Sequence, residues 1–255
     1  MQAVQSLAGK SFVITGAGSG IGHAIALACA EAGANLCLAG RNLSKLEDAA
    51  GRARADGAAG DILVAATDIA STESVAAMYA AALDRFGTLD GLVANAGVMA
   101  PSPPVQDFDE AAFRQAIDVN LLGTARTVAQ GAKILVEQGR GGTILATGSS
   151  LVYRSGPFMS AYVTSKAAVH GFMNTVALDL APHRIRVNLL VPGTSSTPPL
   201  QAMEGFLERA AAATPLGEVV SPDELGRFAV FLLGDAVPHM TGAALVVDSG
   251  KSIAA

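Results

Sequence analysis

Tyr162 and Lys166 are the residues whose types and spacing point most directly to chemistry. Side chains four residues apart lie on one face of a helix, about one turn from each other. A phenol has a pKa near ~10 and is a poor acid or base at neutral pH, but a fixed ammonium beside it favours the phenolate and lowers that pKa. Tyr162 could then exchange a proton with a carbonyl or a hydroxyl group. On a solvated helix surface the same pair would have no such role. Whether the pair is catalytic therefore depends on the helix and strands that position it.

A serine upstream could act with this pair. Ser149 lies thirteen residues before Tyr162 and follows the apolar run 143–147. A strand that ends there would place the Ser149 hydroxyl at the mouth of a cleft. Ser150 is the adjacent serine and could orient the same loop, and either hydroxyl could instead serve as a cap at the end of the strand.

Composition excludes several classes of function. The chain has 255 residues, of which 51% are hydrophobic, so a sizeable core is available. With 17 basic and 22 acidic residues the formal net charge is −5, and the absence of a basic run argues against nucleic acid and anionic membranes as partners. Cys29 and Cys37 lack the spacing of metal ligands and are expected to be buried free thiols.

No targeting or membrane segment is evident in the sequence. The N-terminus lacks a charged region followed by an apolar core, which is the pattern of a signal peptide. The longest uncharged window, 11–30, is interrupted by glycines and does not read as a membrane span. We therefore expect a soluble, cytoplasmic protein.

Short apolar runs alternate with longer, alanine-rich helical patterns along the chain. Fully apolar strands that alternate with helices predict a parallel sheet covered on both faces, which is a three-layer, doubly wound, Rossmann-type α/β fold. No linker or repeat interrupts the pattern, so residues 1–255 are expected to form a single domain. About seven strands are expected, at 12–14, 36–38, 62–64, 89–94, 143–147, 187–191 and 245–247. Helices are expected at 21–32, from a capping box at Ser44 and Glu47, at 71–86, 109–136 and 162–180, and from Ser221.

A glycine-rich loop, residues 15–22, lies between the first expected strand and the first expected helix. Glycines permit a tight turn and let backbone N–H groups approach a pyrophosphate, and the following helix N-terminus favours negative charge. The spacing is T-G-x-x-x-G-x-G, with Ile21 where the third glycine of the usual dinucleotide motif would stand. A simple tight turn between strand and helix is the alternative interpretation.

Together with Asn95-Ala96-Gly97, Tyr162-x-x-x-Lys166 and Pro192-Gly193, this loop resembles the short-chain dehydrogenase/reductase family. The four motifs follow in the family's order between Lys10 and Gly250. The resemblance implies a nicotinamide dinucleotide bound at the sheet edge. The residues it implies for cofactor binding are Gly16, Ser19, Gly20, Ile21, Gly22, Asp68, Ile69, Asn95, Ala96, Gly97, Tyr162, Lys166, Pro192, Gly193 and Thr197. An isolated Asp68 could equally be a turn residue.

The resemblance also implies a catalytic set of Asn120, Ser149, Tyr162 and Lys166. The family serine lies thirteen residues before the tyrosine and seven after the glycine that opens the fifth strand, and both counts from this sequence give Ser149. In the implied reaction, hydride passes between the nicotinamide and a ketone or aldehyde while Tyr162 exchanges the proton. Lys166 would hold the nicotinamide ribose, and Asn120 would position a water in a proton relay.

The end of the second strand bears on which nicotinamide is used. Dinucleotide sites often carry an acidic residue there for the adenosine ribose. Gly40 offers no such carboxylate, and Arg41 has a planar, permanently charged guanidinium suited to a phosphate. The sequence therefore predicts NADP(H), with NAD(H) as the alternative if Arg41 is only a solvated loop residue.

Residues 194–218 are the least regular stretch after the sheet, and the family has a mobile substrate lid in this position. Leu200, Met203, Phe206 and Leu207 predict an apolar pocket wall, unless they form the core of a small helix. Segments 98–104 and 151–159 would complete the site, and Arg154 is the only candidate there for binding a carboxylate. The expected substrate is a small carbonyl compound or alcohol, and the resemblance implies a tetramer or dimer.

Two departures from the family pattern are expected to lie away from the catalytic residues: Glu218 after Pro215-Leu216-Gly217, and 247–250, where two glycines are more usual. Two other classes of function are alternatives to an oxidoreductase. A non-catalytic dinucleotide sensor would not need to keep the complete catalytic set. A dinucleotide-dependent isomerase or dehydratase of this kind is usually longer than 255 residues.

Overall fold

The computed structural model describes residues 6–254 and contains a seven-stranded, fully parallel sheet with the strand order β3-β2-β1-β4-β5-β6-β7. Strand order reverses between β1 and β4, as in a doubly wound fold, so the predicted fold class is confirmed. The strands are β1 (Ser11–Thr15), β2 (Asn35–Gly40), β3 (Ile62–Ala66), β4 (Gly91–Ala94), β5 (Gly142–Thr147), β6 (Ile185–Pro192) and β7 (Ala244–Val247).

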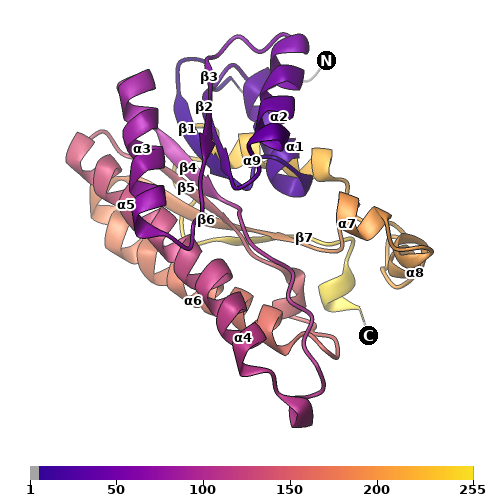
Figure 1. Ribbon diagram of the computed structural model, residues 1–255. Helices are drawn as coiled ribbons and strands as arrows, with labels where there is room; N and C mark the ends of the chain where they lie inside the picture. The colour runs from indigo at the N-terminus through magenta and orange to yellow at the C-terminus, as the bar shows by residue number, and fades with distance from the viewer. Residues whose placement is uncertain (1–5, 255) are drawn as a thin grey trace.

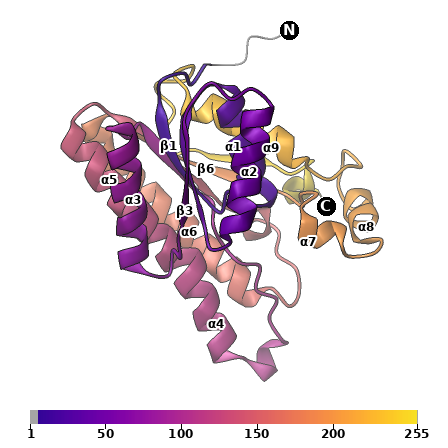
Figure 2. The same ribbon diagram turned by 45° about the horizontal axis from the view of Figure 1, so that its top comes forward.

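Helices cover both faces of the sheet (Figure 1, Figure 2). One layer consists of α1 (Gly20–Glu31), α2 (Leu43–Ala55) and α9 (Pro222–Leu233), and the other of α3 (Thr72–Phe86), α5 (Thr124–Gln138) and α6 (Ser160–Leu180). Successive strand residues point to opposite faces, so Phe12 and Ile14 pack under the first layer and Val13 under the second. Within residues 6–254, no helix is both long enough and apolar enough to cross a membrane.

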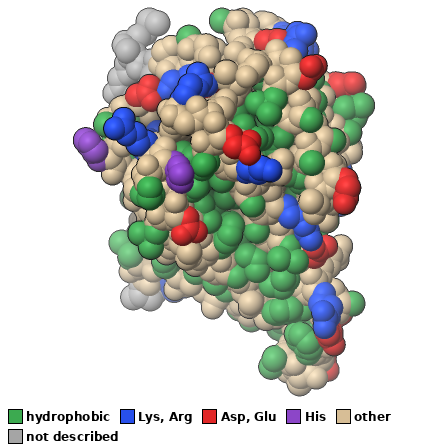
Figure 3. All heavy atoms as spheres, turned by 90° about the vertical axis from the view of Figure 1, so that its left-hand side faces the viewer, with side chains coloured by type: hydrophobic (Ala, Val, Ile, Leu, Met, Phe, Trp, Pro, Cys, Tyr) green, Lys and Arg blue, Asp and Glu red, His purple; other side chains and the backbone are tan. Residues whose placement is uncertain are grey.

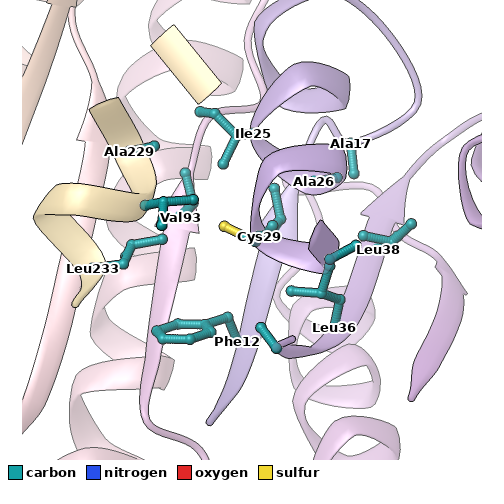
Figure 4. Packing of buried hydrophobic residues seen from close by; sticks show 14 of the residues in the cluster. Phe12, Ala17, Ile25, Ala26, Cys29, Leu36, Leu38, Val93, Ala229 and Leu233 are labelled. Carbon is teal, nitrogen blue, oxygen red and sulfur yellow. The ribbon is translucent and has the colours of Figure 1, made fainter. Parts of the chain in front are cut away.

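The core under α1 shows why the two cysteines are inert. Cys29 lies among Phe12, Ile25, Leu36 and Val93, with its sulfur inside the apolar cluster (Figure 4). Cys37 is buried on the opposite side of the sheet, and neither thiol is oxidised to a disulfide. Burial raises the pKa of both thiols to about 12. The expectation of buried free thiols is confirmed.

The helices predicted to begin at Ser71 and Ser221 do so, and each serine caps its helix. The side chains of Ser71 and Ser221 accept hydrogen bonds from backbone N–H groups in the first turns of α3 and α9. The capping box predicted at Ser44 and Glu47 is wrong, because Asn42 caps α2 by accepting a hydrogen bond from the Lys45 N–H at 3.1 Å. Asparagine is as good an N-cap as serine, and the earlier cap places Ser44 within the first turn.

The long helix predicted over 109–136 is interrupted by a different helical geometry. It begins as α4 (Glu110–Ala116), widens into a π-helical segment, η2 (Ile117–Gly123), and continues as α5. Segments of π-helix are rare and frequently mark functional sites. Farther along the chain, residues 194–218 contain only two short helices, α7 (Pro198–Gln201) and α8 (Phe206–Ala212).

Gly131 tests how tightly α5 packs on the sheet. A Cβ at this position would overlap the Leu92 side chain and lie 2.6 Å from the hydroxyl of buried Tyr79. We expect Gly131→Ala to lower the free energy of unfolding by about 1–3 kcal/mol through overpacking. Gly51→Ala is the matched control, because that helical glycine has open space around it, and we expect it to raise stability by about 0.5–1 kcal/mol. Urea unfolding that gave both variants the same sign of change would contradict this packing.

Candidate active site

The glycine loop is folded tightly against the segment that follows β4. Gly16 and Gly20 have φ values of +71° and +57°, in the left-handed region that glycine adopts without strain. A Cβ at Gly16 would lie 2.9 Å from both Ala96 Cα and Asn95 Nδ2, and one at Gly22 would overlap the Gly16 carbonyl. Gly22 was predicted to bind the cofactor, but here it allows close packing within the loop and lines neither of the cavities described below.

Helix α1 begins without a side-chain cap, unlike α2, α3 and α9. The Ser19 side chain makes no capping hydrogen bond, and the backbone N–H groups of Ser19, Gly20 and Ile21 have no partner among residues 6–254. These three residues line a groove that lies above the carboxyl edge of the sheet and is described below. Unsatisfied N–H groups at a helix N-terminus attract anions, so this end of α1 suits a pyrophosphate.

Asn95 joins the ends of three strands. Its backbone N–H donates to Thr15 Oγ1 at 3.1 Å and its side-chain amide donates to the Thr15 carbonyl at 3.2 Å. The Thr147 hydroxyl donates to Asn95 Oδ1 at 3.0 Å. The carboxyl ends of β1, β4 and β5 are therefore held at fixed separations beneath the groove.

Asn120, within η2, is fully buried, and its amide is bonded on both sides. Its Nδ2 donates to the Val98 carbonyl at 2.9 Å and to Ser165 Oγ at 3.0 Å, while Oδ1 accepts from the Val98 N–H at 2.7 Å. These bonds explain why an asparagine stands inside a helix, since they join the loop after β4 to α6. Asn120 lies behind the groove and lines neither cavity.

Lys166 and Tyr162 lie side by side on α6, as their spacing predicts, in different electrostatic surroundings. Lys166 is only 5% exposed, and its ammonium donates to the Thr147 carbonyl at 2.8 Å. Burial lowers the pKa of Lys166 from its ordinary value of 10.5 to about 8. Burial also raises the pKa of Tyr162, and a hydrogen bond with the Ser149 side chain lowers it.

The expected lowering of the Tyr162 pKa by Lys166 is therefore not what this structure shows. Desolvation of the phenolate is the larger effect, so Tyr162 is held in its neutral form. A neutral phenol is a hydrogen-bond donor and can give up a proton to a developing alkoxide. The arrangement suits protonation of a carbonyl oxygen.

Apart from Gly22 and Asn120, the predicted site residues line a groove made of two adjoining cavities. The first has a volume of about 600 Å³ and is lined by Ser149, Ser150, Tyr162 and Lys166. Pro192, Gly193 and Thr197 also line it, as does an apolar wall of Met99, Pro101, Leu151, Met159, Leu200, Met203 and Phe206. The second, of about 320 Å³, is lined by Arg41, Asp68, Ile69 and Ala96. Ser19, Asn95, Gly97 and Val98 line both, so the groove is long enough to accept an extended ligand.

Lys45 is a cation that sequence reasoning missed. It lies in the first turn of α2, is exposed, and lines the smaller cavity together with Arg41. Neither side chain has an ion-pair partner among the described residues. The wrong prediction of a helix start at Ser44 is the reason that Lys45 was missed. The helix instead begins directly after Asn42, which places Lys45 in the first turn and in the wall of the same cavity as Arg41. Asp68, in the same cavity, accepts a hydrogen bond from the Ala70 N–H at 3.0 Å and so also serves its turn.

The C-terminal departure from the family pattern, residues 247–250, lines neither cavity, but the lysine that directly follows it lies in the site. Lys251 lines the larger cavity, and its ammonium lies 3.4 Å from Thr194 Oγ1. Arg154, the predicted candidate for binding a carboxylate, does not line that cavity. Its guanidinium instead donates to the Ala254 carbonyl at 2.6 Å. The sequence does not reveal Lys251 as a site residue, because no local motif marks it. It reaches the cavity only through the fold of the whole chain.

Comparison with known proteins identifies the family. A family model described as enoyl-(acyl carrier protein) reductase matches residues 16–252. The chain is 36% identical over 251 residues to a 2,5-dichloro-2,5-cyclohexadiene-1,4-diol dehydrogenase of Sphingobium indicum, covering 97% of this chain and 98% of that protein. The chain belongs to the short-chain dehydrogenase/reductase family.

Solved short-chain dehydrogenase/reductase structures share the whole fold. A short-chain type dehydrogenase/reductase from Mycobacterium marinum has a TM-score of 0.92 and 33% identity, with 98% of each chain covered. The 3-ketoacyl-(acyl-carrier-protein) reductase of Brucella melitensis, complexed with NADH, has a TM-score of 0.90 and 32% identity, covering 97% of this chain and all of that one. Like its relatives, this short-chain dehydrogenase/reductase is an NAD(P)-dependent oxidoreductase.

The buried Lys166 gives this short-chain dehydrogenase/reductase a testable pH dependence of stability. Between pH 8 and 10.5 the unfolded chain binds more protons than the folded one, so the cost of burying Lys166 falls as pH rises. We expect Lys166→Met to be more stable relative to wild type at pH 7 than at pH 10. The difference in free energy of unfolding between the variant and wild type, measured with urea, should change by about 2 kcal/mol from pH 7 to pH 10.

Lys133→Met is the control for this measurement, because Lys133 is exposed on α5. Its effect on the free energy of unfolding should be the same at both pH values. A constant effect of Lys166→Met across the same range would show that the Lys166 ammonium is not desolvated in the folded protein.

Proposed function

We propose that this chain is an NADP(H)-dependent oxidoreductase that interconverts a ketone or aldehyde and the corresponding alcohol, with Tyr162 as the acid and base. One observation carries the proposal: a single groove joins the uncapped N-terminus of α1 to half-buried Tyr162 and buried Lys166. Neither a sensor nor a scaffold would need that pair at the end of such a groove.

The residues along the groove fit a nicotinamide dinucleotide. The free N–H groups of Ser19, Gly20 and Ile21 would hold the pyrophosphate, and 95–97 would contact the adenosine ribose. Asp68 and Ile69 would contact the adenine, while Pro192, Gly193 and Thr197 would border the nicotinamide. When bound, the cofactor supplies or accepts the hydride.

The chain's own groups would handle the proton. Ser149 and Tyr162 would donate hydrogen bonds to the substrate oxygen, and the neutral phenol would give its proton to that oxygen as the carbonyl is reduced. The Lys166 ammonium would hold the nicotinamide ribose and would stabilise the phenolate left on Tyr162. Asn120 would keep the loop after β4 and helix α6 in register and would position a water in the proton relay.

Arg41 and Lys45 support NADP(H) over NAD(H). Arg41 directly follows β2, Lys45 lies in the first turn of α2, and both line the smaller cavity. Neither has an ion-pair partner among residues 6–254, so both are free to bind a 2′-phosphate. Binding of NADH by the Brucella melitensis relative keeps NAD(H) as the alternative cofactor.

The cavity beside Tyr162 supports an apolar, ring-shaped substrate. Its lining surface is mostly apolar and includes Met99, Met159 and Met203, and flexible methionines adapt to irregular shapes. The name of the Sphingobium indicum relative describes a substrate built on a cyclohexadiene ring. Residues 194–218 would act as a lid, because Leu200 on α7, Met203 in the turn that follows and Phe206 on α8 all line the cavity.

Assembly and location complete the proposal. Hydrophobic side chains gather on the face formed by α5 and α6 (Figure 3), and Leu178 on α6 is 76% exposed. Such a face suits contact with a second copy of the chain, in a dimer or tetramer. The reduced, buried thiols Cys29 and Cys37 fit a cytoplasmic location.

Tyr162→Phe tests the acid–base role. We expect turnover of a cyclohexanone to fall by about 100-fold or more, since the phenol supplies the proton, while NADPH binding measured by fluorescence is retained. Tyr153→Phe is the matched control, because Tyr153 is exposed and lies outside the cavity. Turnover by Tyr162→Phe at more than a few per cent of wild type would rule out the phenol as proton donor.

The double variant Arg41→Ala/Lys45→Ala tests cofactor choice. Loss of two charge-assisted contacts to the 2′-phosphate should raise the KM for NADPH by about 10- to 100-fold and leave the KM for NADH nearly unchanged. Lys133→Ala, which removes an exposed lysine from α5, should change neither constant. An unchanged KM for NADPH in the double variant would favour NAD(H) as the cofactor.

A further inference from the structure

The last turn of the chain folds back toward the cleft. After β7, the buried carboxylate of Asp248 accepts hydrogen bonds from the N–H groups of Gly250 at 3.0 Å and Ser252 at 2.7 Å. Ser249 and Gly250 have φ values of +55° and +81°, so the backbone reverses sharply at these two residues. The short 3₁₀ turn η5 (Lys251–Ile253) follows.

Two neighbouring segments hold this turn in place. On one side, the Arg154 guanidinium, from the segment after β5, donates to the Ala254 carbonyl. On the other side, the Leu216 N–H donates to the Ser249 carbonyl at 3.2 Å, and a Cβ at Gly250 would contact Pro215 at 3.0 Å. The C-terminal segment accordingly lies beside α7 and α8 in both ribbon views (Figure 1, Figure 2).

This anchoring brings the Lys251 ammonium into the wall of the substrate cavity. The ammonium donates there to a neutral hydroxyl, Thr194 Oγ1, at the long distance of 3.4 Å. Lys251 forms no ion pair with any described residue, and no aspartate or glutamate is among the residues that line the cavity. Lys166, the other cation in the wall, is already bonded to the Thr147 carbonyl.

A half-buried ammonium in a mostly apolar cavity is stabilised by an anion that enters with the ligand. The phosphates of the cofactor already have groups suited to them, at the N-terminus of α1 and at Arg41 and Lys45. Lys251 lies instead beside Thr194, on the wall formed by the lid and the C-terminal turn, and shares a cavity with Tyr162.

We propose that Lys251 binds a carboxylate carried by the substrate, so that this enzyme selects ring ketones and ring alcohols that bear a carboxylate away from the reacting carbon. This inference rests on the proposed oxidoreductase function and names the substrate class of the same site. Lys251 sets specificity in it, whereas Tyr162 and Ser149 act on the reacting oxygen.

A matched pair of ketones tests the assignment, namely 4-oxocyclohexanecarboxylate and the neutral 4-methylcyclohexanone, with NADPH. Wild type should show a kcat/KM at least about tenfold higher for the carboxylate. Lys251→Met should lower kcat/KM for the carboxylate by about 10- to 100-fold and change that for the neutral ketone by less than about twofold. Lys251→Arg should retain most of the preference, and Lys133→Met should change neither value.

A binding measurement makes the test independent of turnover. Cyclohexanecarboxylate, which has no reacting carbonyl, is titrated calorimetrically into each protein in the presence of NADP⁺. The Kd should be at least about tenfold higher for Lys251→Met than for wild type. Equal Kd values, an equal loss with both ketones, or a rise confined to the KM for NADPH would each overturn the assignment. If neither ketone is reduced by wild type, the proposed function fails, and the titration still decides whether Lys251 binds a carboxylate.

Discussion

The hydrogen bonds that join Thr15, Asn95 and Thr147 are the constraint on which the rest of the site depends. They hold the carboxyl ends of three parallel strands together, where the loops of a doubly wound sheet form its binding crevice. Thr147 belongs to two sets of contacts, since its hydroxyl bonds Asn95 and its carbonyl bonds the Lys166 ammonium. The framework of the sheet therefore fixes the position of the buried cation directly.

Burial then gives the two groups on α6 their chemical character. Removing Lys166 from water destabilises its ammonium, and one good hydrogen bond offsets only part of that cost. Removing Tyr162 from water favours the neutral phenol, which is the form that a proton donor needs. A phenolate formed on Tyr162 would provide the counter-ion that the Lys166 ammonium lacks. The pair therefore favours the state in which Tyr162 has given up its proton.

The sequence predicted what depends on local pattern. Apolar runs located the strands, and the order of the glycine loop, Asn95, Tyr162 and Pro192 indicated the edge at which they meet. It did not predict features set by long-range contacts. The π-helical turn around Asn120 depends on bonds to Val98 and Ser165, which no periodicity reveals.

Long-range contacts also explain the other features that the sequence did not predict. The direction of the Tyr162 pKa shift depends on how completely the fold excludes water, and the position of Lys251 depends on a turn held by Asp248 and Arg154. A residue's spacing along the chain reports neither burial nor distant partners. The charged residues that should set cofactor and substrate preference, Lys45 and Lys251, were therefore visible only once the chain was folded.

Isotope transfer tests the central claim most directly, because hydride and proton must reach the substrate from different sources. The enzyme would reduce a cyclohexanone in ordinary water with NADPH deuterated at the transferring position of the nicotinamide. Direct hydride transfer should place the deuterium on the carbinol carbon, and the hydroxyl hydrogen should come from solvent by way of Tyr162. Deuterium that stayed on the nicotinamide, or that was lost to water, would contradict direct hydride transfer at this site.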